Sequence, residues 1–200
     1  MSGFDEVVGR VLRASTRGYV CGTHSTRLDG RHDFGAFVKA PIANDESIIA
    51  LGVIYAIEIK DDLLINELVM AEAVDPNVLR DQRENRMIPV EVSVLNIGYT
   101  DGRSFIHSIP PRPPMSLSQV MLCSQEDVLQ FTRKLDFLRL ILQASEVPSE
   151  ALIGAAVRYS SYAYEATEQE AFLIRAGQHL AKTIGDDTRR LSAILGLLHP

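Results

Sequence analysis

A short N-terminal segment holds four side chains of the types that bind zinc, namely Cys21, His24, His32 and Asp33. A Cys-x-x-His spacing is compatible with a zinc site. Residues three apart on a strand point to opposite faces of the sheet, so Cys21 and His24 could share a metal only around a tight turn at Gly22. We therefore expect no metal ion to be bound here.

The remaining groups able to move protons are isolated in the sequence. His107 falls in an expected strand with no acid or nucleophile close to it in the chain. His179 follows Arg175 by four residues on an expected helix, which predicts an exposed or interfacial position. Glu168 and Glu170 fall in the first turn of that helix, where carboxylates complement the positive end of the helix dipole. None of these groups predicts a catalytic pair.

The sequence lacks the common catalytic and nucleotide-binding motifs. It contains no Gly-x-x-x-x-Gly-Lys-Ser/Thr phosphate loop, no Gly-x-Gly-x-x-Gly after a strand and no Gly-x-Ser-x-Gly elbow. We therefore predict no catalytic residue and no cofactor, and we interpret the chain as a non-enzymatic protein.

Composition places the chain among ordinary globular proteins. Its 200 residues are 46% hydrophobic and 23% charged, with a net charge of −6, which excludes collagen, coiled coil and general disorder. Residues 1–40 carry six basic and four acidic side chains, whereas residues 41–86 carry four and ten. The basic start could meet phosphate, but a solvated face is the favoured interpretation.

Cellular location is inferred from three negative signals. Two cysteines, Cys21 and Cys123, are too few for a disulfide framework and indicate buried thiols in a reducing compartment. The N-terminus lacks the basic and apolar regions of a signal peptide. The longest apolar run, residues 48–57, is half of the roughly 20 residues that a membrane span needs. These signals predict a soluble, cytoplasmic protein.

The first half of the chain reads as short strands separated by turns, which predicts a small closed β-barrel. The longest strand should be buried on both faces or bent at Gly52. In residues 88–99 the apolar side chains change phase after Val94, as a β-bulge would cause. Asp101-Gly102 predicts a type I′ hairpin turn. The expected strands are 7–12, 18–22, 34–39 (ended by Pro41), 48–59, 88–99, 104–109 and 118–123.

Helices are expected in an insertion and throughout the second half. Residues 61–86 read as two helical pieces, and the proline run 109–114 as a stiff spacer. From Ser124 onward the apolar spacing predicts four helices, the first running to about residue 142. The fold class is therefore α+β, with a barrel domain at 1–123 and a helical domain at 124–200.

Helix ends carry their own signals. Ser124 with Asp127 predicts one capping box, and residues 167–170 predict another. Gly185 is expected to end the third helix, and Asp186 is expected to cap the last one.

Three tyrosines, Tyr159, Tyr162 and Tyr164, lie close together on one expected helix. Tyrosine buries a ring while keeping a polar tip, which suits packing between domains or subunits. Core packing is the favoured role. The partner surface that we predict otherwise consists of Arg112, Tyr159, Tyr162 and Phe172.

The strand half resembles the HAS barrel, the small N-terminal barrel of HerA-type helicases and of the α and β subunits of ATP synthase. The resemblance rests on a scheme written G-x-V, G-x-x-V-x-V and x-G-V-V. The later segments 108–114, 122–124 and 135–139 are similar to stand-alone bacterial HAS-barrel proteins with a helical tail. The segments that follow the scheme are Val8-Gly9-Arg10-Val11-Leu12, Phe34-Gly35-Ala36-Phe37-Val38-Lys39 and Leu51-Gly52-Val53-Ile54-Tyr55.

In those relatives the barrel is not catalytic; it lies beside neighbouring barrels and helps to form a ring above an ATPase core. The resemblance therefore implies an assembly or adaptor protein, either a homo-oligomer, most simply a dimer, or a protein docked on a separate ring ATPase. Open strand edges and the tail aromatics also favour an oligomer. The first alternative is an accessory nucleic-acid-binding partner of a HerA-like translocase, using the basic N-terminal strands. The second is an enzyme acting through His107 or the Cys21/His24 region.

Overall fold

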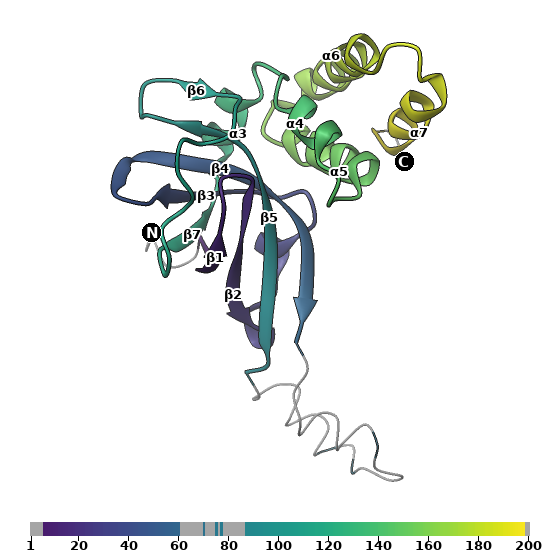
Figure 1. Ribbon diagram of the computed structural model, residues 1–200. Helices are drawn as coiled ribbons and strands as arrows, with labels where there is room; N and C mark the ends of the chain where they lie inside the picture. Colours follow the sequence, from purple (N-terminus) through teal and green to yellow (C-terminus); the bar gives the residue numbers. More distant parts are fainter. Residues whose placement is uncertain (1–5, 61–69, 71–74, 76, 78–86, 199–200) are drawn as a thin grey trace.

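The computed structural model describes residues 6–60 and 87–198, together with Met70, Asp75 and Asn77. Within these ranges seven strands precede five α-helices, and the helices predicted in 61–86 lie outside the described residues (Figure 1). The strands are β1 (Val7–Ala14), β2 (Gly18–His24), β3 (Phe37–Ile42), β4 (Asp45–Ile59), β5 (Pro89–Thr100), β6 (Phe105–Ile106) and β7 (Gln119–Leu122). The helices are α3 (Gln125–Phe131), α4 (Leu138–Gln143), α5 (Ser149–Ser161), α6 (Ala166–Ile184) and α7 (Thr188–Leu198), with the 3-10 turns η1 (Ser25–Arg27) and η2 (Gly30–His32) in the β2–β3 connection.

Six of the strands close into an antiparallel barrel. Its order is β2-β1-β7-β3-β4-β5, and β2 pairs with β5 from Gly18 opposite Leu95 to His24 opposite Pro89. This closure confirms the α+β class and the small barrel. It also shows that the expectation of open strand edges was wrong, because closure leaves β6, a two-residue strand paired to β5, at the end of the sheet.

Alternation along the strands explains why β3, β4 and β5 are buried on both faces. One set of side chains fills the barrel and includes Val38, Ile54 and Val94. The intervening set, which includes Phe37 and Val53, points outward into a core shared with the helices. The helices therefore cover the outer face of β3, β4 and β5, and the two parts of the chain share one apolar core (Figure 1).

The phase change in β5 arises because both faces of the strand are buried, and a bulge follows it. Leu51 pairs with Gly98 and Gly52 with Asn96, so Ile97 is an extra residue and the predicted bulge is confirmed two residues past the change. Leu95 and Ile97 are apolar because their side of the strand faces the helices. Gly52 lies opposite this bulge, and a second register shift follows in β4 between Ile54 and Ala56.

Aromatic rings join the barrel to the helices. Phe37 on β3 lies edge-on to Phe131 and Phe137, with ring centroids 6.2 and 5.9 Å away. Tyr159 on α5 stacks on Phe37 at 5.9 Å with an interplanar angle of 22°. A salt bridge of 2.5 Å between Lys39 on β3 and Asp127 on α3 adds a polar tie at the same junction.

The helical half differs from the prediction at its first helix. One helix was expected from Ser124 to about residue 142, but the structure breaks it into α3 and α4 at Thr132. The Thr132 hydroxyl donates to the carbonyl of Val128, and the turn that follows keeps Leu135 and Phe137 in the core. The apolar spacing therefore continues through a segment that is not helical.

Helix ends and one strand end also needed correction. The Ser124–Asp127 capping box and the stop at Gly185 are confirmed. The box expected at Thr167 is absent, because α6 begins two residues earlier than that box requires, with Glu165 rather than Thr167 as its N-cap. Asp187 rather than Asp186 accepts the backbone N–H of the first turn of α7.

Pro41 does not end β3. It lies inside the strand, where its carbonyl accepts from the N–H of Met115. The proline run is tied to the same strand end, since Pro114 bridges Ile42 and the Pro113 carbonyl accepts from Ala43.

The hairpin between β5 and β6 is present, but its turn is not type I′. That turn needs a positive φ at both central residues, and here Gly102 has a φ of +81° whereas Asp101 does not. The Asp101 carboxylate instead accepts from the N–H groups of Arg103 and Ser104. A wider loop with an Asp-capped turn therefore makes the connection.

No helix in the described parts of the chain combines the length and the apolar character needed to cross a membrane.

Candidate functional site

The N-terminal residues that resembled metal ligands are dispersed. Cys21 is buried inside the barrel, where burial raises the pKa of its thiol to about 12. The ring of His24 bonds to Thr26, and the buried ring of His32 bonds to the carbonyl of Val8 at 3.0 Å. Across the described residues no three His, Cys, Asp or Glu side chains are grouped as a metal site would require.

His107 lies beneath the helices rather than in an exposed catalytic position. Its Nε2 bonds to the carbonyl of Phe131 at 3.1 Å, and its ring lies 4.3 Å from that of Phe131. Burial lowers the pKa of His107, against opposing effects of the Phe131 carbonyl and Asp136. The Nδ1 atom is buried without a hydrogen-bond partner in the structure. These contacts make His107 a half-buried packing residue between β6 and α3.

The four residues of the predicted partner surface occupy different environments. Phe172 is buried and stacks on Tyr164 at 4.4 Å, and Tyr159 is half-buried against Phe37. Arg112 is exposed and pairs with Asp45 at 3.3 Å. Tyr162, at the end of α5, is 72% exposed. The structure therefore does not bring the four together, and Tyr162 is the large aromatic side chain among them that faces solvent.

A groove of about 250 Å³ lies beside Tyr162. It runs from the end of β7 across the start of α3 to the end of α5, and most of its lining is apolar. The side chains of Leu122, Val128 and Tyr159 form its floor and walls, with Gln125 as a polar group. The Gln125 amide donates to the carbonyl of Ala163, which fixes the end of α5 against α3. An exposed ring beside an apolar groove is the arrangement that protein interfaces use as an anchor.

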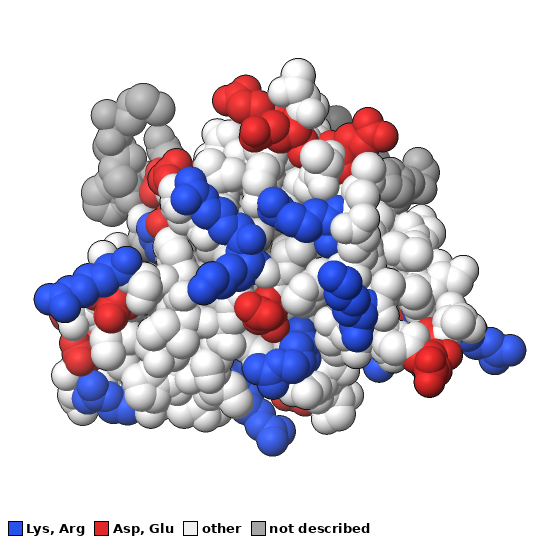
Figure 2. All heavy atoms as spheres, turned by 90° about the horizontal axis from the view of Figure 1, so that it is seen from above, with Lys and Arg blue, Asp and Glu red and all other residues white. Residues whose placement is uncertain are grey.

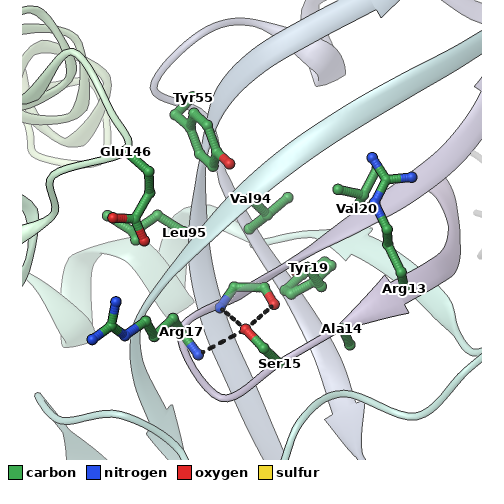
Figure 3. Close-up of a pocket in the computed structure, with 11 residues that line it drawn as sticks. Arg13, Ala14, Ser15, Arg17, Tyr19, Val20, Tyr55, Val94, Leu95 and Glu146 are labelled. Atoms are coloured by element: carbon green, nitrogen blue, oxygen red, sulfur yellow. Dashed lines mark hydrogen bonds between the residues drawn. The ribbon is translucent and has the colours of Figure 1, made fainter.

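A second hollow, of about 340 Å³, lies where the β1–β2 turn approaches the loop between α4 and α5. Figure 3 shows Arg17 and Glu146 on one side of it and Arg13 on the other. Arg13 is held by two hydrogen bonds to Glu91, the shorter 2.6 Å long. The hollow therefore has charged rims and an apolar floor that includes Val94.

The hydroxyl at this hollow serves the turn rather than a reaction. Ser15 Oγ donates to the carbonyl of Gly18 at 3.2 Å and accepts from the N–H groups of Arg17 and Gly18 (Figure 3). No histidine or cysteine lines this hollow beside Ser15. The arrangement can bind charged groups at its rim, but it does not supply a nucleophile with its base.

Three of the six basic side chains in residues 1–40 form ion pairs with carboxylates, and Lys39 is one of them. Arg13 pairs with Glu91, and Arg31 pairs with Asp29 at 2.6 Å. These carboxylates reduce the positive potential that the N-terminal strands were expected to offer to phosphate. A basic hollow of about 300 Å³, which the sequence did not reveal, instead lies between α6 and the α3–α4 turn.

Comparison of the sequence with known proteins does not assign the chain to a family. No protein-family model matches the chain, and no match was found among curated proteins.

Proposed function

We propose that the chain is a non-enzymatic assembly or adaptor protein that acts through contacts with other proteins. The observation that carries this proposal is Tyr162, exposed at the edge of the apolar groove between β7, α3 and α5. Exposed tyrosines next to apolar pockets are the residues that dominate binding energy at protein interfaces. The rigid junction behind the groove suits this role, because Tyr159 forms the groove wall and also stacks on the barrel.

We also propose that the barrel is of the HAS kind. Support comes from the three glycines of the scheme, each of which lies at a close approach of backbones. A methyl group added at Gly9 would collide with Gly22, one at Gly35 with Ala155 and one at Gly52 with the β5 backbone. The positions quoted from the sequence are therefore positions where this barrel tolerates no side chain.

The first contact that we propose is between two copies of this chain, since barrels of the resembled kind lie against neighbouring barrels. A two-fold dimer is the simplest closed assembly. A separate ring ATPase is the protein on which such an assembly would dock.

Sedimentation equilibrium of the full chain at micromolar concentration tests the self-contact. We expect a dimer, and we expect Tyr162→Ser to weaken it about 30-fold, as loss of an interface anchor worth roughly 2 kcal/mol would do. Ile174→Ser is the matched control, because Ile174 is 52% exposed on α6 and does not line the groove.

A wild-type chain that stays monomeric at every concentration would overturn the dimer. A dimer weakened equally by Tyr162→Ser and Ile174→Ser would place the contact away from the groove. Circular dichroism of both variants would check that neither has lost its fold.

A further inference from the structure

The helical end of the molecule carries a basic hollow. It lies between the turn that joins α3 to α4 and one face of α6. Lys and Arg side chains gather over the middle of the face viewed from the helical end, and most acidic side chains lie nearer its edges (Figure 2). The charged and polar residues that line the hollow include Arg133, Lys134, Asp136, Arg175, His179 and Lys182.

The positive charge in this hollow is not neutralised by the protein. Four cationic side chains face one carboxylate there, in a chain whose net charge is −6. Within the described parts of the chain, Arg133, Lys134 and Lys182 make no ion pair and no side-chain hydrogen bond. Like charges held around one hollow repel each other, so an anionic ligand would stabilise the arrangement.

Arg175 is held in place without a carboxylate. Its guanidinium donates to the Tyr164 hydroxyl at 3.1 Å and lies 5.8 and 5.4 Å from the ring centres of Tyr164 and Phe172. The Tyr164 hydroxyl also bonds to Thr132 at 3.0 Å, inside the core. These contacts orient the cation while leaving its charge available, which reduces the entropy lost when an anion binds.

The spacing of the groups matches a linear polyanion. Arg175, His179 and Lys182 lie at i, i+4 and i+7 on α6, so they share one face and span about 10 Å along the helix. Arg133 and Lys134 line the opposite wall. Phosphates of one nucleic-acid strand recur every 3.4 Å or so along a duplex axis, so several of them could contact this hollow together.

We propose that this hollow binds the phosphate backbone of nucleic acid. Protein–nucleic acid interfaces are more polar and more positive than interfaces between proteins, which need buried apolar anchors. The apolar residue among the lining side chains, Leu135, is itself buried, so the hollow offers charge without an anchor for a protein. Its lining has four cations and no Phe, Tyr or Trp ring, so the expected contacts are with phosphates, which carry no sequence information.

This contact goes beyond the proposed adaptor function, because it gives the chain a second kind of ligand at a surface other than the Tyr162 groove. A partner protein and a nucleic-acid strand could then be held by one molecule.

Fluorescence polarisation of the full chain with a dye-labelled single-stranded DNA of about 20 nucleotides tests the proposal. With four phosphate contacts, the logarithm of the binding constant should fall with the logarithm of salt concentration with a slope of about −3. The double variant Lys134→Ala, Lys182→Ala should bind about tenfold more weakly at low salt and halve the slope. The double variant Arg27→Ala, Arg103→Ala is the control, because it removes two exposed cations that line neither this hollow nor the one at Ser15, and it should leave both values near wild type.

Asp136→Asn provides a change of the opposite sign that misfolding would not imitate. It removes the carboxylate from the hollow and should tighten binding several-fold. The absence of binding at low salt would overturn the proposal, as would equal losses in the hollow and control variants. Displacement of the DNA by an equal charge concentration of polyglutamate would also overturn it, because the site would then be one for acidic protein segments.

Discussion

Gly35, two residues before β3, packs directly against α5, and replacing it with alanine tests how rigid that contact is. The residue has a φ of +88°, and its N–H donates to the carbonyl of Ile54. A methyl group built on it would lie 2.7 Å from the Ala155 side chain and 2.8 Å from the Ala155 carbonyl carbon. The second of these is helix backbone, which cannot rotate away as the end of a long side chain could.

Two costs add in Gly35→Ala. The left-handed backbone costs an alanine roughly 1–2 kcal/mol. Insertion of a methyl into a closely packed contact costs about 1–3 kcal/mol more. We therefore expect the free energy of unfolding to fall by about 2–5 kcal/mol. For a chain of this size each kilocalorie lowers the melting temperature by about 2–4 °C.

Gly102→Ala separates the two costs. Gly102 has a φ of +81°, close to that of Gly35, but no atom lies within 4 Å of the added methyl. The free energy of unfolding of Gly102→Ala should fall by about the backbone cost alone. The difference between the two variants therefore measures the cost of the collision with α5. Urea unfolding followed by circular dichroism gives both values if the slope with denaturant is unchanged. Equal losses in the two variants would refute the reasoning and show that α5 moves away from the barrel at little cost.

Three further outcomes follow from buried groups. The thiols of Cys21 and Cys123 should resist alkylation in the native protein and react fully in urea, because both are buried and burial raises their pKa values; rapid native labelling would contradict the closed barrel. Burial lowers the pKa of His107 below 6.5, so as the pH falls the unfolded chain takes up a proton before the folded one does. The free energy of unfolding should therefore fall as the pH drops from 7 to 5, and it should fall less in His107→Leu. Burial opposes ionisation of Asp127, but its bonds to Lys39 and to the start of α3 outweigh that effect and lower its pKa. Asp127→Asn should therefore destabilise the protein by about 1 kcal/mol at pH 7. The difference in stability between wild type and variant, measured by urea midpoints, should disappear as the pH falls below about 3.8.

The barrel was predictable because its signals are local. Alternation in β2 and β5, the glycine in β4 and the phase change after Val94 each report on one strand and its two faces. The meaning of that phase change was less accessible. Leu95 and Ile97 are apolar because helices cover the outer side of β5, and that cover comes from residues more than thirty positions later.

The turns failed for the opposite reason, because competing local solutions fit the same residues. Asp101-Gly102 suits a type I′ turn, yet the Asp101 carboxylate bonds two N–H groups and makes a wider loop. The apolar spacing from Phe131 to Leu138 suits one helix, yet Thr132 bonds back to Val128 and the chain turns. At Asp101 a short polar side chain satisfies two backbone N–H groups and stabilises the wider loop. At Thr132 the backbone N–H and the hydroxyl both bond to the Val128 carbonyl, and α3 ends there.

The candidate surfaces needed the tertiary structure. Tyr162 belonged to the predicted partner surface, but Phe172 turned out to be core, since an amphipathic pattern does not tell a self-contained array from an interface. The basic hollow joins Lys134 to residues on α6 that are more than forty positions away. From the sequence, the spacing of Arg175 and Lys182 on one helix face indicated the α6 wall of this hollow, but nothing indicated the opposite wall.

The position of β7 has a consequence for synthesis of the chain on the ribosome. β1 and β3 are joined through β7, whose residues 119–122 are made after all the other barrel strands. A nascent chain that has reached only β6 therefore has two unpaired strand edges facing each other across a gap. Unpaired edges pair readily with other chains, so this intermediate is the one most exposed to aggregation. Because α3 begins three residues after β7 ends, emergence of a single short strand closes the barrel and delivers the first helix to its outer face.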